Sequence, residues 1–314
     1  MKISVIITVV NRKEFISNAL RSLCEQTKPP YDVVVVSNIF LEDVFSQFNP
    51  VFKINLIYSD SLFQGENISK ALKLCQGDVI SFLEDDDEFE PKKIETVAKT
   101  FSSNNNLVLF RNDPSFINQS SGYIPDPTPN HRKLIAKKNS IHFSECKDKN
   151  IALFFRADAY FNLSTMSFRR GLLESIVMDM NRVWLGIDFI LSYAALASGR
   201  EILITSEKLT RYRVHEKHFS TSTEWKGYKM FANTFVISNR LAMRENKHAI
   251  FEDSIVTLLF LKVRLLNSIR YRKRKIYRNL FRNLLSHKKG LKLFFFSNPR
   301  FCAYNLMLLI KNMI

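Results

Sequence analysis

The chain has 314 residues, of which 46% are hydrophobic and 24% are charged, and its formal net charge is +16. This length and apolar content favour one large domain or two modest ones and argue against a mainly disordered protein. The four cysteines lie far apart without C-x-x-C spacing, which argues against a zinc site and a disulfide framework. No stretch approaches the roughly 18–20 apolar residues that a membrane-spanning helix needs.

The positive charge is concentrated at the C-terminal end. All 30 acidic residues lie at or before Asp253, whereas the 61 residues that follow contain 14 Lys and Arg. The preceding part of the chain is therefore nearly neutral. A basic tail of this kind favours a polyanionic partner, either nucleic acid or anionic lipid headgroups.

Apolar runs and helical stripes alternate over the first 110 residues. Predicted strands cover 4–7, 33–36, 54–58, 79–83 and 107–110, and predicted helices cover 13–26, 68–75 and 94–101. Asn11 followed by Glu14 is typical of a capped start for the first helix. The alternation predicts a doubly wound, mostly parallel α/β sheet with helices on both faces.

The rest of the chain is less regular. Residues 112–150 are polar and rich in Asn, Lys and Pro, which predicts an irregular insertion near the active face. A helix around 188–198 and a strand over 201–206 follow, and from about 229 the pattern is helical and increasingly basic. We therefore expect a catalytic domain over 1–225 and a basic helical region over 226–314.

Five adjacent acids, residues 84–88, follow the predicted strand 79–83 directly. Ligands of an open parallel sheet bind beyond the carboxyl ends of its strands. Adjacent carboxylates repel one another unless a cation offsets them, and Mg²⁺ or Mn²⁺ with oxygen ligands could bridge such a site to a diphosphate. A solvated acidic turn explains the same run equally well.

Four motifs in order resemble the family-2 glycosyltransferases. Residues 82–91, FLEDDDEFEP, are similar to the family pattern F-L-D-x-D-D-x-W-x-P, and residues 4–12, SVIITVVNR, to S-V-I-I-P-T-Y-N-R. Residues 186–189, GIDF, resemble the G-E-D-Y segment, and residues 212–215, YRVH, resemble Y-R-x-H. The resemblance covers residues 3–222 and leaves the C-terminal third out.

This resemblance implies the GT-A fold and an inverting, metal-dependent transfer from a nucleotide sugar linked to UDP, GDP or dTDP. Glu84 and Asp86 take the metal-binding positions, with Mg²⁺ or Mn²⁺ as the cofactor, and His215 completes the metal site. Asp188 matches the general base that takes the proton of the acceptor hydroxyl. The positions assigned to the donor are Thr8, Val10, Asn11, Arg12, Ser37, Asn38, Lys70, Asp85 and Arg213.

Several positions depart from the family pattern. Ser37 and Asn38 replace an acid pair that reads the base and ribose, Ile68 replaces an Arg, and Ile187 replaces the Glu beside the base. Asn and Ser can still hydrogen-bond a nucleotide. The departures favour an active enzyme with altered donor choice, and the alternative is a catalytically inactive sugar- or nucleotide-binding scaffold.

The basic C-terminal segment has the pattern of an interfacial helix. Ile276, Leu280 and Leu284 form one apolar stripe, and Arg278 and Arg282 lie off it. Such a helix can lie on an anionic membrane, which would suit a glycan or lipid-linked acceptor and a cytoplasmic protein peripheral to the membrane. The alternative is a helical hairpin packed on the catalytic domain. Nucleic acid is a weaker expectation, because no recognised nucleic-acid module accompanies the charge.

Overall fold

The computed structural model describes residues 1–127, 139–143, 153–154, 159–160, 162–215, 274–288, 291–292, 299–311 and 313. The chain divides into two compact units, of which the first comprises Met1–Ser144, Phe161–Arg182 and Arg200–His218. The second comprises Glu145–Tyr160, Val183–Gly199 and Phe219–Ile314. The boundary predicted near 225 and the helical pattern predicted from 229 to 273 lie outside the described residues.

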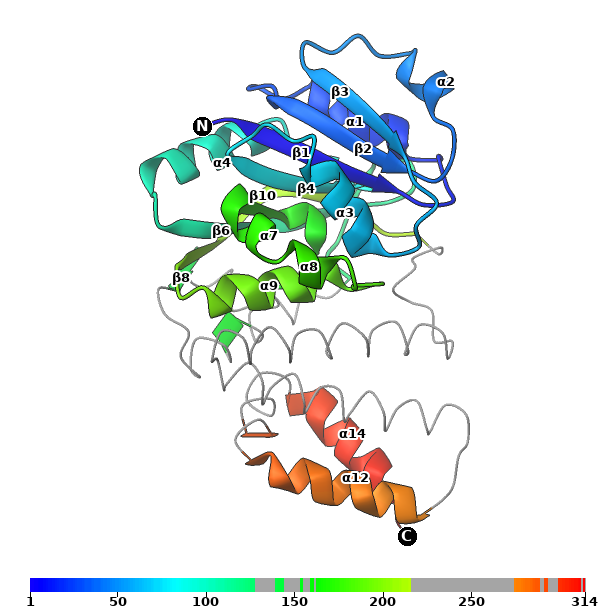
Figure 1. Ribbon diagram of the computed structural model, residues 1–314, viewed down its shortest axis with the longest axis vertical. Coiled ribbons are helices and arrows are strands. Elements are labelled where there is room, and N and C mark those ends of the chain that lie inside the picture. Colours follow the sequence, from blue (N-terminus) through cyan, green and yellow to red (C-terminus); the bar gives the residue numbers. More distant parts are fainter. Residues whose placement is uncertain are drawn as a thin grey trace. The chain divides into compact units, whose positions relative to one another are not determined.

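The first unit is built on a ten-stranded sheet (Figure 1). The main path of the sheet runs in the order β3-β2-β1-β4-β9-β6-β10-β5, while β7 pairs with β6 and β8 pairs with β10. The strands are β1 (Ile3–Val9), β2 (Asp32–Ser37), β3 (Lys53–Tyr58), β4 (Val79–Glu84), β5 (Glu88–Phe89), β6 (Leu107–Ile117), β7 (Tyr123–Ile124), β8 (Ser140–Phe143), β9 (Met166–Arg169) and β10 (Glu201–Arg213).

Strands β3, β2, β1 and β4 form the parallel half of the sheet. All six residues of β2 are buried, and so are six of the seven residues of β1. A parallel strand covered on both faces needs a continuous apolar run rather than an alternating one. The run of four valines in β2 meets this need, and the prediction of a doubly wound α/β sheet is confirmed.

Helices cover both faces of this sheet. Figure 1 shows α3 (Gln64–Leu72) in front of the strands and α1 (Ile16–Cys24) behind them. The other helical elements of the first unit are α2 (Glu42–Phe45), α4 (Lys93–Ser103), the short 3₁₀ helix η1 (Leu163–Thr165), α7 (Arg170–Ser175) and α8 (Val177–Met180). The second unit contains α9 (Ile187–Ala197), α12 (Arg274–Ser286) and α14 (Pro299–Lys311).

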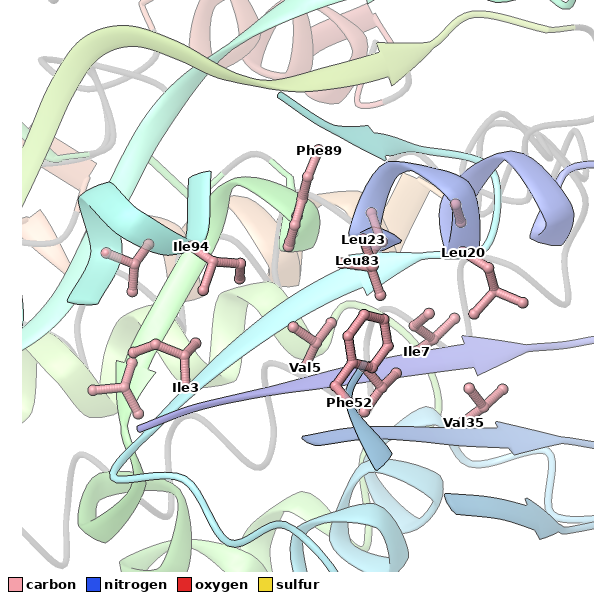
Figure 2. Close-up of a cluster of buried hydrophobic side chains, with 14 of the residues drawn as sticks. Ile3, Val5, Ile7, Leu20, Leu23, Val35, Phe52, Leu83, Phe89 and Ile94 are labelled. Atoms are coloured by element: carbon pink, nitrogen blue, oxygen red, sulfur yellow. The ribbon is translucent and has the colours of Figure 1, made fainter. Parts of the chain in front are cut away.

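The main hydrophobic core lies between the sheet and the helices α1 and α4. Figure 2 shows Val5 and Ile7 of β1 on the side of Leu20 and Leu23 of α1, and Ile3 on the side of Ile94 of α4. Every second residue of β1 points to this face, as the period of two in a strand requires. Burial of a side chain of this size contributes about 1.5–3 kcal/mol, so this layer fixes β1 against α1.

The other half of the sheet was not predicted in full. β9 lies antiparallel between β4 and β6, and β6 continues to Ile117 through residues expected to be an irregular insertion. This expectation was wrong for 112–117, because the polar groups there are paired inside the sheet. Asn112 donates to Thr210 Oγ1 at 3.1 Å, and Asp113 accepts hydrogen bonds from Arg111 and Lys208.

The predicted cap of the first helix was also wrong. α1 begins at Ile16 after Phe15, and no side chain caps it. The Asn11 side chain is instead paired with Asn38, at the end of β2. A competing tertiary hydrogen bond has therefore taken the group that the local pattern assigned to the helix. Cys24, the last residue of α1, is exposed.

In the second unit, α12 and α14 pack on one another through an apolar cluster. Tyr277, Leu280 and Leu284 of α12 are buried in it with Cys302 and Leu309 of α14. The predicted stripe on α12 is therefore the packed side of a helix pair. No helix in the described parts of the chain is both long enough and apolar enough to cross a membrane.

Candidate active site

The acidic residues lie at the edge of the sheet where the parallel strands end. β1 ends at Val9, β2 at Ser37 and β4 at Glu84. Because β1 pairs in parallel with both β2 and β4, the residues that follow these strands meet at one edge. The turn Asp85–Asp87 therefore faces Asn11 and Arg12.

Asp85, Asp86 and Asp87 are buried, with 6%, 7% and 1% of their surface exposed. The reading of this run as a solvated acidic turn is therefore wrong. Buried carboxylates need compensating charges and hydrogen bonds. The geometry supplies these groups from segments far apart in the sequence.

Arg12 provides the nearest positive charge. Its Nε and Nη2 donate to the two oxygens of Asp85 at 2.9 and 2.7 Å, which makes a bidentate ion pair. The same Nη2 lies 2.5 Å from Asp86 Oδ2. Burial opposes the charge on Arg12, but Asp85 and Asp86 outweigh it and raise the pKa of the guanidinium.

His215 reaches the same carboxylate from the end of β10. Its Nε2 lies 2.9 Å from Asp86 Oδ2 and 3.3 Å from Arg12 Nη1. Its ring packs at 5.4 Å from the ring of Phe15. Two of the predicted metal positions, Asp86 and His215, are thus in direct contact across 129 residues of sequence.

Asn162, at the start of the segment that leads into η1, was missed by the sequence analysis. Its Nδ2 donates to Glu84 Oε2 at 3.1 Å and to Asp87 Oδ2 at 2.8 Å. Ser164 Oγ accepts a hydrogen bond from the backbone N–H of Glu84 at 2.9 Å. These contacts fix the acidic turn to the segment before β9. The only sequence signal for them is that the polar residues Asn162 and Ser164 stand just before that strand.

Two carboxyl groups of the turn have perturbed acidities. Burial raises the pKa of Asp85 to about 6, with Arg12 opposing the rise and Asp86 adding to it. Burial likewise raises the pKa of Asp87 to about 7, and repulsion by Asp86 contributes. Burial therefore favours the protonated form of both carboxyl groups, and repulsion by Asp86 adds to this effect.

Arg213, assigned to the donor by resemblance, is fully buried and engaged by protein groups. Its Nε donates to the backbone oxygen of Asp86 at 2.8 Å, and its Nη1 donates to the backbone oxygens of Asn118 and Gln119. Its Nη2 pairs with Glu88. The structure therefore shows Arg213 as the group that holds the acidic turn against the loop after β6.

The positions expected to bind the nucleotide lie beside this cluster. Asn38 Nδ2 donates to Asn11 Oδ1 at 2.8 Å, and the backbone N–H of Asn11 donates to Asn38 Oδ1 at 2.9 Å. Ser37 Oγ donates to the oxygen of Ile39 at 2.7 Å. The two loops that follow β1 and β2 are thus joined through their own amide groups.

Three further donor positions are more dispersed. Thr8 lies on β1 beside Glu84 in register, and Val10 is 41% exposed at the end of the same strand. Lys70 lies on α3, where its Nζ donates to Ser59 Oγ at 2.9 Å and pairs with Glu66. Lys70 thus contacts the residue that follows β3 rather than the acidic turn.

Asp188 lies in the first turn of α9, in the second unit. Its Oδ1 accepts a hydrogen bond from the backbone N–H of Phe189 at 3.0 Å. The ring of Phe189 stacks on Tyr160 at 4.6 Å, and Gly186 before the helix has a positive φ of 81°. The carboxylate is therefore placed at a helix start, where the helix dipole favours its charged form.

The chemistry of the cluster fits a hard divalent cation. Among the described residues, no three His, Cys, Asp or Glu side chains are grouped so as to hold a metal by themselves. Mg²⁺, however, is normally held by one or two carboxylates and by the phosphates of a substrate. Asp86 and His215, 2.9 Å apart, are the side chains of the cluster that could serve as protein ligands in such a shared site.

The chain is similar to proteins of a known family. The sequence profile described as glycosyl transferase family 2 matches residues 4–174. An uncharacterized glycosyltransferase of Nostoc sp. is 24% identical over 237 residues, which are 71% of this chain and 68% of that protein. One from Haemophilus influenzae is 28% identical over 129 residues, 40% of this chain and 44% of the other.

A solved structure has the same fold. The structure of Staphylococcus aureus TarS residues 1–349 in complex with UDP-GlcNAc superposes with a TM-score of 0.59 at 16% identity, covering 100% of this chain and 89% of the other. The TarS sequence, named a poly(ribitol-phosphate) beta-N-acetylglucosaminyltransferase, is 25% identical over 195 residues. That alignment covers 53% of this chain and 34% of TarS, so the chain spans well under two thirds of that relative.

Proposed function

The chain belongs to glycosyl transferase family 2 and is a glycosyltransferase, and from this premise we propose that it moves a sugar from a nucleotide donor to a glycan or lipid-linked acceptor. We propose a single displacement of the nucleoside diphosphate by the acceptor hydroxyl, which inverts the configuration at the anomeric carbon. The observation that carries the proposal is the contact of Asp86 with both His215 and Arg12 at the carboxyl edge of the sheet. This edge is where ligands of such sheets bind.

Each residue of the acidic cluster has a role in this proposal, and Asp188, in the second unit, keeps the role that its family motif implies. Asp86 and His215 would hold Mg²⁺ or Mn²⁺ together with the donor diphosphate, and Glu84 would orient the turn through its contact with Asn162. The cation would stabilise the negative charge that develops on the departing diphosphate. Asp188 would take the proton of the acceptor hydroxyl as that oxygen attacks the anomeric carbon.

The TarS complex supports a UDP-linked sugar as the first donor to test. Ser37 and Asn38 would meet the base and ribose with hydroxyl and amide groups in place of carboxylates, beside the amide of Asn11. An amide offers both a donor and an acceptor, whereas an ionised carboxylate offers acceptors only. Donor preference in this chain is therefore expected to differ from that of relatives with an acid pair at these positions.

The test measures the melting temperature with UDP-, GDP- and dTDP-sugars, with and without Mn²⁺. A ligand that binds only the folded state stabilises it by about 2.7 kcal/mol at a hundredfold excess over its Kd. We expect one nucleotide sugar to stabilise the wild type only with metal, and Asp86→Ala to abolish that gain. Asp43→Ala is the matched control, because Asp43 is an exposed carboxylate paired with Lys13.

The inactive scaffold remains the alternative, and turnover separates the two. An active enzyme hydrolyses or transfers the stabilising nucleotide sugar with Mn²⁺, and Asp188→Asn lowers that turnover without lowering the thermal shift. Binding without turnover in the wild type would favour the scaffold. Absence of any nucleotide-dependent shift would contradict donor binding itself.

We also propose that the α12–α14 pair binds an anionic membrane surface, which would place a cytoplasmic enzyme beside a lipid-linked acceptor. Arg278 and Arg282 are exposed on α12, on the side away from the apolar cluster. Leu285, 42% exposed, and Met307, 55% exposed, add apolar surface on the two helices. Cations beside exposed apolar groups suit a headgroup layer.

A further inference from the structure

The guanidinium of Arg12 lies against the carboxylate that is expected to bind the metal. Arg12 Nη2 is 2.5 Å from Asp86 Oδ2, and the same oxygen is 2.9 Å from His215 Nε2. Arg12 Nη1 is in turn 3.3 Å from that imidazole nitrogen. Arg12, Asp86 and His215 thus form a closed set of contacts around one carboxylate oxygen.

A divalent cation cannot bind Asp86 Oδ2 while the guanidinium remains at this distance. The two positive groups would compete for one oxygen and would repel one another at close range. Arg12 does not have to leave the site, however. Its Nε is 2.9 Å from Asp85 Oδ2, so a small rotation could release Asp86 while this second bond is kept.

We propose that Arg12 is a placeholder for the metal: it neutralises Asp86 until the cation arrives with the donor diphosphate, and then turns its released N–H groups to that diphosphate. Arg12 is 24% exposed, so the guanidinium has room at the surface for this change. The inference rests on the proposed function, since it presumes a metal–diphosphate at Asp86. It also explains why the metal should bind tightly only together with the nucleotide: the diphosphate accepts the hydrogen bonds that Arg12 gives up at Asp86.

The placeholder also explains how the turn stays folded before the ligands bind. Three buried aspartates in a row would otherwise repel one another. The loop after β1 places Arg12 over this turn, and the mutual hydrogen bonds of Asn11 and Asn38 fix that loop. The hydrogen bonds of Asn11, the residue before Arg12, therefore fix the backbone that positions the arginine.

The experiment measures the Kd of Mn²⁺ by electron paramagnetic resonance of the free ion, with and without UDP. For the wild type we expect weak Mn²⁺ binding alone and much tighter binding with UDP. For Arg12→Gln we expect Mn²⁺ alone to bind about tenfold more tightly or more, because the competing charge is gone. UDP should then raise the Mn²⁺ affinity by a smaller factor than in the wild type.

Lys13→Gln is the matched control. It removes one positive charge at the next residue, but Lys13 pairs with Asp43 at 2.8 Å and is not in contact with the turn. A general change of electrostatic field would tighten Mn²⁺ binding in both variants, whereas the placeholder affects Arg12→Gln alone. Arg12→Lys keeps the positive charge but cannot form the bidentate hydrogen bonds to Asp85. Its Mn²⁺ affinity should fall between those of the wild type and Arg12→Gln.

The outcomes separate this inference from the function on which it rests. Unchanged or weaker Mn²⁺ binding by folded Arg12→Gln, with normal binding of Mn²⁺ and UDP by the wild type, overturns the placeholder alone. If Arg12→Gln does not fold, the same comparison with Arg12→Lys decides. Failure of the wild type to bind Mn²⁺ even with the nucleoside diphosphates of all the candidate donors, UDP, GDP and dTDP, overturns both proposals.

Discussion

Lys93, the first residue of α4, is buried without a compensating charge. Its Nζ donates to Asn112 Oδ1 and to the backbone oxygen of Thr165, and it lies 5.2 Å from the centre of the Phe89 ring. No carboxylate in the described parts of the chain forms an ion pair with it. Burial, and then repulsion by Arg111, lower the pKa of this amine well below its usual value.

The pH dependence of stability follows from that lowered pKa. Between the folded and the unfolded pKa, the unfolded chain binds one more proton at Lys93 than the folded chain does. The free energy of unfolding therefore rises with pH, by at most about 1.4 kcal/mol per pH unit from this group. We expect Lys93→Met to raise the melting temperature at about pH 7, and this gain to shrink towards about pH 9.

The control is Lys92→Met, because Lys92 precedes Lys93 in the chain but is exposed. Its melting temperature should differ from that of the wild type by the same small amount at each pH. A gain for Lys93→Met that does not change with pH would show that the native amine carries its proton. The readout is the difference between variants, so the titration of other groups cancels.

Individual site residues could be predicted where they follow a strand directly, and could not where they come from elsewhere. The acids of 84–88 were found because β4 is an apolar run that ends at them. The contacts of Arg12 with Asp85 and of Asn162 with Asp87 span 73 and 75 residues. No local pattern encodes such pairs. Nor does the motif that contains Arg213 indicate that this side chain contacts the backbone of Asp86 and of the loop after β6.

At the scale of elements, the approach of β1 to the turn before β4 depends on one small residue. A Cβ added to Gly77 would lie 2.4 Å from the backbone nitrogen of Ser4, a distance that real contacts do not reach. Gly77 N–H also donates to Ser4 Oγ at 2.7 Å. α3 ends at Leu72, five residues before Gly77, so the glycine is required by this close contact rather than by the end of the helix.

Substitution of two glycines by alanine should therefore change the free energy of unfolding in opposite directions. Gly77→Ala must displace the backbone of β1, and we expect it to destabilise the first unit by several kcal/mol, as strain in a packed core does. Gly171→Ala lies in α7, where an added Cβ meets nothing within 4 Å. It should stabilise by about 0.5–1 kcal/mol through helix propensity. Urea unfolding of both variants measures the two effects, and similar values would contradict the close contact at Gly77.

The strands and helices of the parallel half were predictable because each has a clear period and both faces are covered. β9 was not, since Met166–Arg169 is a four-residue strand with two buried polar residues nearby, Ser164 and Thr165. Its place between β4 and β6 is decided by pairing with both neighbours, for instance through the contact of Ser167 Oγ with Ser81 Oγ at 2.7 Å. Such pairing is a property of the folded sheet rather than of the segment.

At the scale of the whole molecule, the charge distribution bears on the proposed binding to an anionic membrane. The excess of Lys and Arg lies after Asp253, and Arg278 and Arg282 are exposed on α12. Each basic side chain near an anionic surface contributes about 1 kcal/mol, which salt screens. We expect Arg278→Gln with Arg282→Gln to weaken binding to vesicles that contain phosphatidylserine by about 30-fold at low salt.

The control removes the same charge from the first unit. Lys28 and Lys99 are exposed there, and Lys28→Gln with Lys99→Gln should leave vesicle binding nearly unchanged. Cosedimentation with anionic and with neutral vesicles, at low and at high salt, separates attraction to headgroups from burial of apolar groups. Equal weakening by both pairs would mean that net charge alone directs the protein to the surface. Weakening by the α12 pair alone assigns the contact to this helix, because its cations lie beside exposed Leu285 while its opposite side is packed on α14.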